Sequence, residues 1–369
     1  MCQLRKPSKI LFNSKYALNI SAMKIPFFGQ RRTVLKRFVQ YSLLGLFALS
    51  TPLTGSLLQT SQAQTKSGFS AKVINLAYQT SGDIVKVKKV VEPRFKALGV
   101  KVNWVGPFPA GPQLIEAMNA GKVDIGTVGE TPPIFSQAAG ITEVIYIAGR
   151  VPSRGLGQGI IVRANSPIKK LADIKGKKVA FQRGSNAHYL LAKALKEVGL
   201  KISDVQVVGL TPSEARDAFI QNKVEVWVGG DPFLALVEKT IPIRNLRNAS
   251  GINTLGGFYL GRREFITKNP ELVRVFLEEA DKVGEWADKN PKEVAKAFAP
   301  ELKLDLSVLE TVARRRTYRL RKLTSSIVAE QQRVADFYFE EKVIPRKINV
   351  KDATLPPQLS EAITPKRLK

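Results

Sequence analysis

Four short loops of the sequence carry polar side chains suited to holding a small anion. Each follows a strand-like run and precedes a helix-like run, and they span 78–82, 109–113, 129–133 and 183–186. A helix N-terminus presents unpaired N–H groups and a partial positive charge, which together suit an oxyanion. Hydroxyl and amide side chains in these loops add neutral hydrogen-bonding groups: Gln79, Ser81, Gln113, Thr131, Ser185 and Asn186. The four loops together favour a shared oxyanion site, although each loop taken alone is more typical of a simple helix cap.

The elements that must position these loops alternate along the chain. Short β-rich runs fall at 73–78, 102–105, 123–128, 144–148, 178–181, 205–210 and 224–228. The helix-like segments between them stop at Gly99, Gly121, Gly140 and Gly199, and glycine adopts the left-handed conformation after a helix without steric penalty. Repeated units of this kind predict an α/β fold with mainly parallel sheets flanked by helices. Loops at the carboxyl ends of parallel strands share one rim, so we expect them to meet at a crevice.

The C-terminal third is predicted to be mainly helical. Asn269-Pro270 and Asn290-Pro291 each place a potential capping side chain before a proline at the first helical position. Apolar residues then recur at helical spacing, so the helix after Pro270 is expected to pack one face on the α/β body. The stretch 314–322 holds many Lys and Arg residues. Two interpretations remain open: a solvated basic face, or a contact with an anion or partner.

Composition excludes several kinds of chemistry. The 369 residues include one Cys and one His and carry a formal charge of +27. A thiolate metal cluster needs several Cys, and a His-ligated metal usually needs at least two His, so we predict neither metal nor cofactor. His188 is expected to be a packed helix residue. Glu130 and Asp231 could form a carboxylate pair for acid–base catalysis, but an anion site would repel two nearby carboxylates.

The first 63 residues have the composition of an export signal. They contain nine Lys or Arg and no Asp or Glu, and a basic stretch leads into an apolar run of about a dozen residues, too short to span a bilayer. Ser61 and Ala63 suit a signal-peptidase site, with Gln64 as the first mature residue. Arg31-Arg32 is similar to a twin-arginine signal. Cleavage would remove Cys2 and leave a mature chain with a formal charge of +18.

Several motifs together resemble one family, the aliphatic sulfonate-binding proteins of ABC importers. They lie at 108–113, 129–135, 176–180, 184–191, 226–233 and 329–332. The resemblance runs from about residue 72 to about residue 353. It implies a periplasmic binding protein of the two-lobed (type II) fold, with two mainly parallel sheets and two crossings between lobes. The expected lobes are 72–161 plus 255–350 and 162–254, followed by a tail at 351–369.

The resemblance also implies a site and partners. The matched motifs make Gln79, Gly111, Pro112, Thr131, Ser185 and Trp227 the ligand-contact candidates. An exported monomer would capture an alkanesulfonate and deliver it to an ABC permease for sulfur uptake. The chain departs from the family pattern at Glu130, where Asp is usual, and at Gly229-Gly230, where a bulky residue and a second Trp are common. Without larger side chains, the two glycines either leave the pocket enlarged or have neighbours whose side chains fill the space. Trp227 is either a surface on which the carbon chain of the ligand stacks or a residue of the hydrophobic core.

Other functions stay open at this point. A protein of the same fold could bind taurine, nitrate or a thiamine precursor instead. An enzyme is disfavoured, because the chain lacks a G-x-S-x-G elbow and a G-x-x-x-x-G-K-[ST] phosphate loop. A binder of nucleic acid or anionic surfaces would rest on net charge alone, and export argues against nucleic acid.

Overall fold

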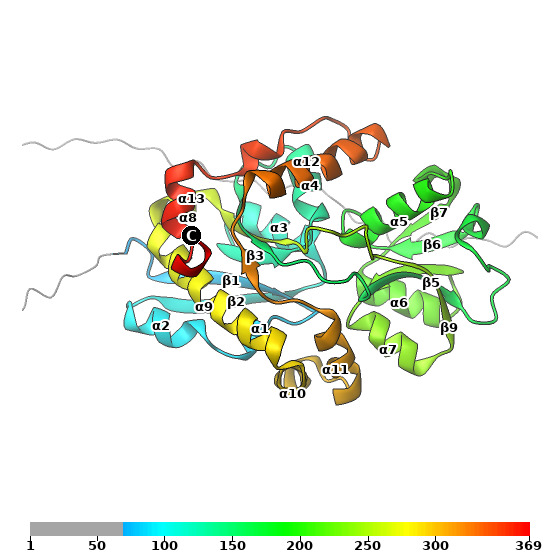
Figure 1. Ribbon diagram of the computed structural model, residues 1–369, viewed down its shortest axis with the longest axis horizontal. Helices are drawn as coiled ribbons and strands as arrows, with labels where there is room; N and C mark the ends of the chain where they lie inside the picture. Colours follow the sequence, from blue (N-terminus) through cyan, green and yellow to red (C-terminus); the bar gives the residue numbers. More distant parts are fainter. Residues whose placement is uncertain (1–68) are drawn as a thin grey trace, which may run out of the picture. The chain divides into compact units, whose positions relative to one another are not determined.

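The computed structural model describes residues 69–369, so the predicted leader 1–63 and its cleavage site lie outside the described residues. Two sheets form its framework (Figure 1). The first has the order β11-β4-β10-β3-β1-β2 and contains β1 Val73–Gln79, β2 Lys101–Phe108, β3 Ile125–Val128, β4 Val144–Arg150, β10 Phe258–Arg262 and β11 Leu320–Arg321. The second has the order β7-β6-β8-β5-β9 and contains β5 Gln158–Arg163, β6 Lys178–Phe181, β7 Gln206–Gly209, β8 Val226–Gly230 and β9 Ile243–Asn248.

Helices surround both sheets. They are α1 Ile84–Val87, α2 Val91–Ala97, α3 Gly111–Asn119, α4 Thr131–Ala138, α5 Asn186–Glu197, α6 Pro212–Ile220, α7 Phe233–Thr240, α8 Arg263–Lys268, α9 Pro270–Lys289, α10 Pro291–Leu302, α11 Leu306–Arg315, α12 Ser325–Glu340 and α13 Pro357–Ile363. Short 3₁₀ turns lie at Leu171–Ile174, Ile202–Asp204, Val350–Ala353 and Lys366–Leu368. In the described range, no helix combines the length and apolar character that a membrane crossing requires.

The predicted α/β class is confirmed, and each of the seven predicted strands overlaps an observed one. The sheets are mixed: β1 runs parallel to β2 and β3, and β6 runs parallel to β7 and β8, whereas β5, β9, β10 and β11 are antiparallel to their neighbours. Sequence reasoning missed these four antiparallel strands. They make the sheets less parallel than predicted.

The glycines predicted to end helices do so. Gly99, Gly121, Gly140 and Gly199 have φ of 70°, 72°, 92° and 72°, all in the left-handed region. Each lies two residues after the last residue of α2, α3, α4 or α5. A residue with a Cβ would be strained there, which is why these positions mark the helix ends so clearly.

The two Asn-Pro pairs start helices as predicted, but their side chains act differently from the prediction. Helices α9 and α10 begin at Pro270 and Pro291, yet neither Asn caps the helix that follows it. The Asn269 amide donates to the Phe265 carbonyl at 3.1 Å, and the Asn290 amide donates to the Trp286 carbonyl at 2.8 Å. Both therefore close the end of the preceding helix.

The chain passes between the sheets twice. The first passage lies between Arg150 and Gln158, and the second between Asn248 and Phe258. The predicted boundary after residue 161 is therefore too late, because it falls inside β5, which pairs with β8 and β9. The predicted tail 351–369 includes α13, which packs on α9, and Arg367 there pairs with Asp281. Helix α9 buries the apolar face expected of it against the first sheet.

Candidate ligand-binding site

One cavity of about 330 Å³ brings the four polar loops together. It is lined by residues 79–84, 109–111, 127–129 and 185–187, which lie at or after the carboxyl ends of β1, β2, β3 and β6. Much of the remaining wall comes from the two passages between the sheets, from the end of β8 and from residues 315–318 at and after the end of α11. The cavity thus receives groups from both sheets, at the carboxyl ends of their parallel strands, as expected for ligand sites in α/β folds.

Three of the six predicted contact residues line this cavity: Gln79, Gly111 and Ser185. Gly111 starts α3, and the preceding residue Ala110 makes no side-chain cap. Pro112 has no N–H, so the Gly111 and Gln113 N–H groups are the ones that no side chain of the described residues satisfies. The Gln79 amide donates to the Thr127 carbonyl at 2.6 Å. The Ser185 hydroxyl caps α5 by accepting from the Ala187 N–H at 3.2 Å, and it donates to the Gln182 carbonyl.

Thr131 and Pro112, by contrast, are absent from the cavity wall. Thr131 is fully buried; its hydroxyl lies 3.3 Å from that of Tyr338, and its N–H donates to Asn186 Oδ1 at 3.2 Å. Asn186, on α5, therefore caps the N-terminus of α4. Gly129 makes room for this contact, because a Cβ there would fall 2.1 Å from Asn186 Oδ1. The predicted role of Thr131 as a direct ligand contact does not fit this arrangement, since α4 is already capped.

Trp227 is core rather than a stacking surface. It is fully buried, does not line the cavity and packs on Phe219 with ring centroids 5.8 Å apart. Gly229 and Gly230 do line the cavity. A Cβ on Gly229 would lie 2.0 Å from the Trp227 ring, so the indole already fills the space that a side chain at 229 would need. At this position, a neighbour fills the gap.

The structure adds charged residues that sequence reasoning did not assign to the site. Arg150 and Arg316 line the cavity together with Arg315 and Asp231. Arg315 pairs with Asp231 at 3.4 Å and with Glu238 at 2.8 Å. The basic stretch 314–322 was the available signal for two of these arginines. Many residues of this stretch form ion pairs or hydrogen bonds with other parts of the chain, so the stretch is more than a solvated face. The 2.8 Å ion pair between Arg319 and Asp288 is a further example.

Burial shapes the titration of nearby carboxyl groups. Desolvation raises the pKa of Asp83 at the cavity wall, against the opposing effect of the Val85 and Lys86 N–H groups and of Arg150. Desolvation also raises the pKa of Asp231, and Arg316 and Arg315 oppose that shift.

Glu130 and His188 have structural surroundings. Glu130 is fully buried, does not line the cavity and accepts the Leu255 N–H at 3.0 Å; burial raises its pKa to about 8. It therefore does not face Asp231 across the cavity as an acid–base pair would. The His188 ring accepts the Gly184 N–H at 3.3 Å, and burial lowers its pKa to about 4. It packs between aromatic rings as the packed helix residue that was expected.

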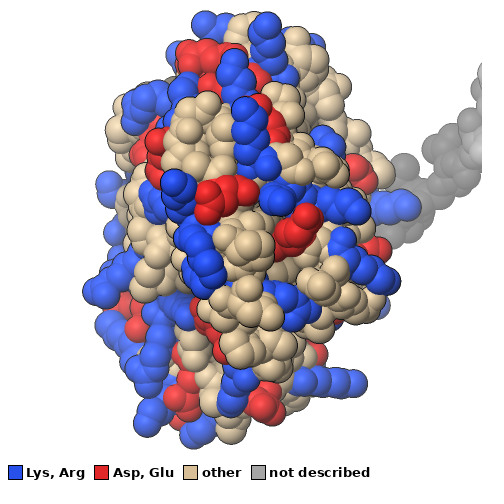
Figure 2. All heavy atoms as spheres, turned by 90° about the vertical axis from the view of Figure 1, so that its right-hand side faces the viewer, with Lys and Arg blue, Asp and Glu red and all other residues tan. Residues whose placement is uncertain are grey.

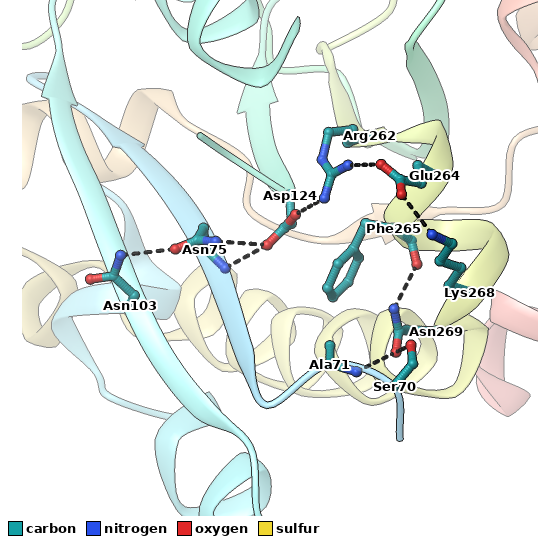
Figure 3. A network of polar contacts seen from close by, with 10 residues as sticks. All are labelled: Ser70, Ala71, Asn75, Asn103, Asp124, Arg262, Glu264, Phe265, Lys268 and Asn269. Atoms are coloured by element: carbon teal, nitrogen blue, oxygen red, sulfur yellow. Dashed lines mark hydrogen bonds and ion pairs between the residues drawn. The ribbon is translucent and has the colours of Figure 1, made fainter. Parts of the chain in front are cut away.

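A second polar cluster lies at the opposite, amino ends of β1 and β3 (Figure 3). Asp124 is buried there and accepts from the Asn75 N–H at 2.8 Å, from the Asn75 amide at 3.1 Å and from Arg262 at 2.9 Å. Glu264 also pairs with Arg262, and Asn269 accepts from Ser70 at 2.8 Å. This cluster joins the start of β1 to α8 and α9, and most of its groups pair with one another, although Arg262 Nε has no partner among the described residues.

Comparisons with known proteins place this geometry in a family. The model of the family described as NMT1/THI5 like matches residues 95–294. An aliphatic sulfonates-binding protein of Escherichia coli (strain K12) is 32% identical over 86% of this chain and 96% of its own length. One of Bacillus subtilis (strain 168) is 35% identical over 73% of this chain and 80% of its own.

A solved structure agrees with both relatives. The alkanesulfonate-binding protein SsuA from Xanthomonas axonopodis pv. citri, bound to MOPS, is 30% identical and matches with a TM-score of 0.72 over 77% of this chain and 98% of that one. The resemblance to aliphatic sulfonate-binding proteins, read from the motifs, is thereby confirmed. The chain belongs to the NMT1/THI5-like family.

Proposed function

We propose that this protein captures aliphatic sulfonates in the cavity between its two sheets and delivers them to an ABC permease for sulfur uptake. Its relatives named for sulfonate binding support the ligand class. The observation that carries the proposal is the cavity itself, where the uncapped N-terminus of α3 meets Gln79 and the α5 cap. A sulfonate has three oxygens, which suits several converging N–H, amide and hydroxyl groups.

The protein acts as an exported, monomeric binder rather than an enzyme. Support comes from the leader-like composition of residues 1–63 and from a relative in Escherichia coli that is described as periplasmic. Cleavage after Ala63 gives a mature protein beginning at Gln64, which N-terminal sequencing checks. A mature protein that retains residues 38–60 would contradict this part of the proposal.

Net charge does not by itself argue for a polyanion partner. On the face shown in Figure 2, Lys and Arg side chains are interspersed with Asp and Glu rather than gathered into one continuous stripe. Binding of nucleic acid would weaken steeply with salt because of counterion release. Binding of a small anion inside the cavity should respond weakly, so a salt titration separates the two functions.

Calorimetry on the mature protein tests the proposal directly. The series consists of alkanesulfonates of increasing chain length and taurine, with sulfate and nitrate as controls. We expect saturable one-to-one binding of alkanesulfonates and weaker binding of sulfate and nitrate. Tight nitrate binding without sulfonate binding would assign the protein to a different ligand, and turnover of a sulfonate during the titration would identify an enzyme.

A further inference from the structure

Two arginines at the cavity wall, Arg150 and Arg316, form no direct ion pair with a carboxylate of the described residues, although Asp83 and Asp231 lie near enough to interact with them electrostatically. The Arg150 guanidinium donates to the Thr317 carbonyl at 2.8 Å, and that of Arg316 donates to the Ser81 and Asp231 carbonyls at 2.7 Å and 3.0 Å. Within residues 69–369, neither forms an ion pair at 4.0 Å or less, unlike Arg315 beside them. Both side chains are only partly exposed.

The acids nearby leave this part of the cavity with an excess of positive charge. Asp231 pairs with Arg315, which also pairs with Glu238. Asp83 is the other carboxyl group at the wall, and its Oδ1 accepts from the Val85 N–H at 2.9 Å. Over residues 69–369, the wall therefore holds three arginines against two carboxyl groups, with Glu238 outside the wall sharing Arg315. A partly enclosed wall of this sign raises the local concentration of anions.

The arginines and the neutral donors occupy different segments of the same wall. Arg150 ends β4, and Arg316 follows α11, whereas Gly111 and Ser185 lie at the starts of α3 and α5. The loop after β1 connects the two sets, because Gln79 contacts the β3 end while the Ser81 carbonyl contacts Arg316. A ligand with polar groups at both ends can meet both sets at once.

We propose that the preferred ligand is a sulfonate with a second anionic group, a carboxylate or another sulfonate, which Arg150 and Arg316 bind. This inference rests on the proposed function. The planar guanidinium fork matches the two oxygens of a carboxylate or sulfonate. Tyr318 lies in the same wall, and its buried hydroxyl has no hydrogen-bond partner among the described residues, so it adds a donor.

Calorimetry with three ligands of matched length tests this on the wild-type protein. They are propane-1-sulfonate, 3-sulfopropanoate, which carries a second negative charge, and 3-aminopropane-1-sulfonate, which carries a positive charge. We expect 3-sulfopropanoate to bind about 10- to 100-fold more tightly than propane-1-sulfonate, the effect of an added charged hydrogen bond. The amine should bind most weakly, since it places a cation against the arginines.

The outcomes distinguish the two proposals. Equal affinity for propane-1-sulfonate and 3-sulfopropanoate, or a preference for the amine, would contradict the proposal that the ligand carries a second anionic group. It would not contradict the proposal that the protein binds sulfonates. Failure of every sulfonate to bind would overturn the proposed function itself.

Variants locate the effect. Arg150→Gln removes the charge while keeping an amide that can donate to the Thr317 carbonyl, and it should reduce the preference for 3-sulfopropanoate to within about threefold. Arg150→Lys keeps the charge and should retain part of the preference. Arg319→Gln is the matched control, because Arg319 is exposed, pairs with Asp288 and does not line the cavity. A folded Arg150→Gln protein that keeps the full preference would overturn the role of Arg150.

Discussion

At the amino ends of β1 and β3, the Asp124 carboxylate accepts from Asn75 and pairs with Arg262, and almost nothing polar is left without a partner. At the carboxyl edge of the same sheet, Arg150 meets only a backbone carbonyl, and the first N–H groups of α3 have no side-chain cap. Both regions are polar and partly buried. They differ in whether their groups satisfy one another.

This difference separates a structural network from a binding site. Groups that pair with one another in the folded protein already have their hydrogen bonds and counterions. They therefore gain little further free energy from binding a ligand. Groups held in place by carbonyl contacts and by the sheet, yet left without a counterion, keep their capacity to bind an anion. The predictions below test this contrast between the two edges.

The largest effect is expected at Asp124. Replacing it with Ala leaves Arg262 without its buried partner and should lower the free energy of unfolding by about 3–5 kcal/mol. Denaturant unfolding measures the loss. Glu264→Gln is the control, because Glu264 pairs with the same arginine from an exposed position and should cost less than about 1 kcal/mol. Equal losses in the two variants would contradict the contrast.

Ser185 and Thr131 allow a residue that lines the cavity to be compared with a nearby residue that does not. Ser185→Ala should weaken sulfonate binding by about 10- to 100-fold, because Ser185 lines the cavity and positions the α5 N-terminus. Thr131→Val removes a contact with Tyr338 away from the cavity; it should cost about 1 kcal/mol of stability and change affinity by less than about threefold. A Thr131→Val protein with the larger loss of affinity would restore Thr131 as a ligand contact.

Gly229 tests how closely the cavity wall is packed. Gly229→Ala places a methyl group against the Trp227 ring and should destabilise the protein by about 1–3 kcal/mol through overpacking. Gly230→Ala is the neighbouring control with the smaller expected loss, since its Cβ would meet the Gln158 side chain at 3.0 Å and the Gly157 carbonyl at 3.1 Å rather than a ring at 2.0 Å. Thermal unfolding of both variants measures the difference. Tolerance of Ala at 229 would mean that the indole moves readily.

The smallest effect is a pH dependence from Glu130. Its pKa rises from an ordinary 4.5 to about 8 on folding, so the folded protein holds a proton that the unfolded chain releases. The stability linked to this proton is fully present below pH 4.5 and is lost as the pH rises toward 8, by about 2 kcal/mol between pH 6 and 8. Glu130→Gln should remove this slope, which denaturant unfolding at several pH values would measure. An unchanged slope would assign the pH dependence to other groups.

Local signals explain what could be predicted from the sequence. The central strands are apolar along their length, and the glycines after α2 and α3 have positive φ, so the pattern and the structure depend on the same short-range physics. Strand β9, with the sequence Ile-Arg-Asn-Leu-Arg-Asn, lacks such a signal. Its extended form depends on pairing with β5, which is distant in sequence.

The site follows the same rule. The polar loops could be found because each is a local strand-to-helix junction. Arg150 could not be assigned, because its partner Thr317 is far along the chain. Thr131 and Trp227 carry polar or aromatic groups typical of binding sites, but burial decided their roles, and burial depends on Tyr338 and Phe219 from other elements.

The position of Trp227 gives the protein an internal optical probe. Its indole lies against Gly229, which lines the cavity, and the indole N–H has no hydrogen-bond partner in the described part of the chain. Indole emission responds to nearby charge and to hydrogen bonding. An anion arriving on the other side of Gly229 should therefore change the intensity or wavelength of emission, without a label and without the indole touching the ligand.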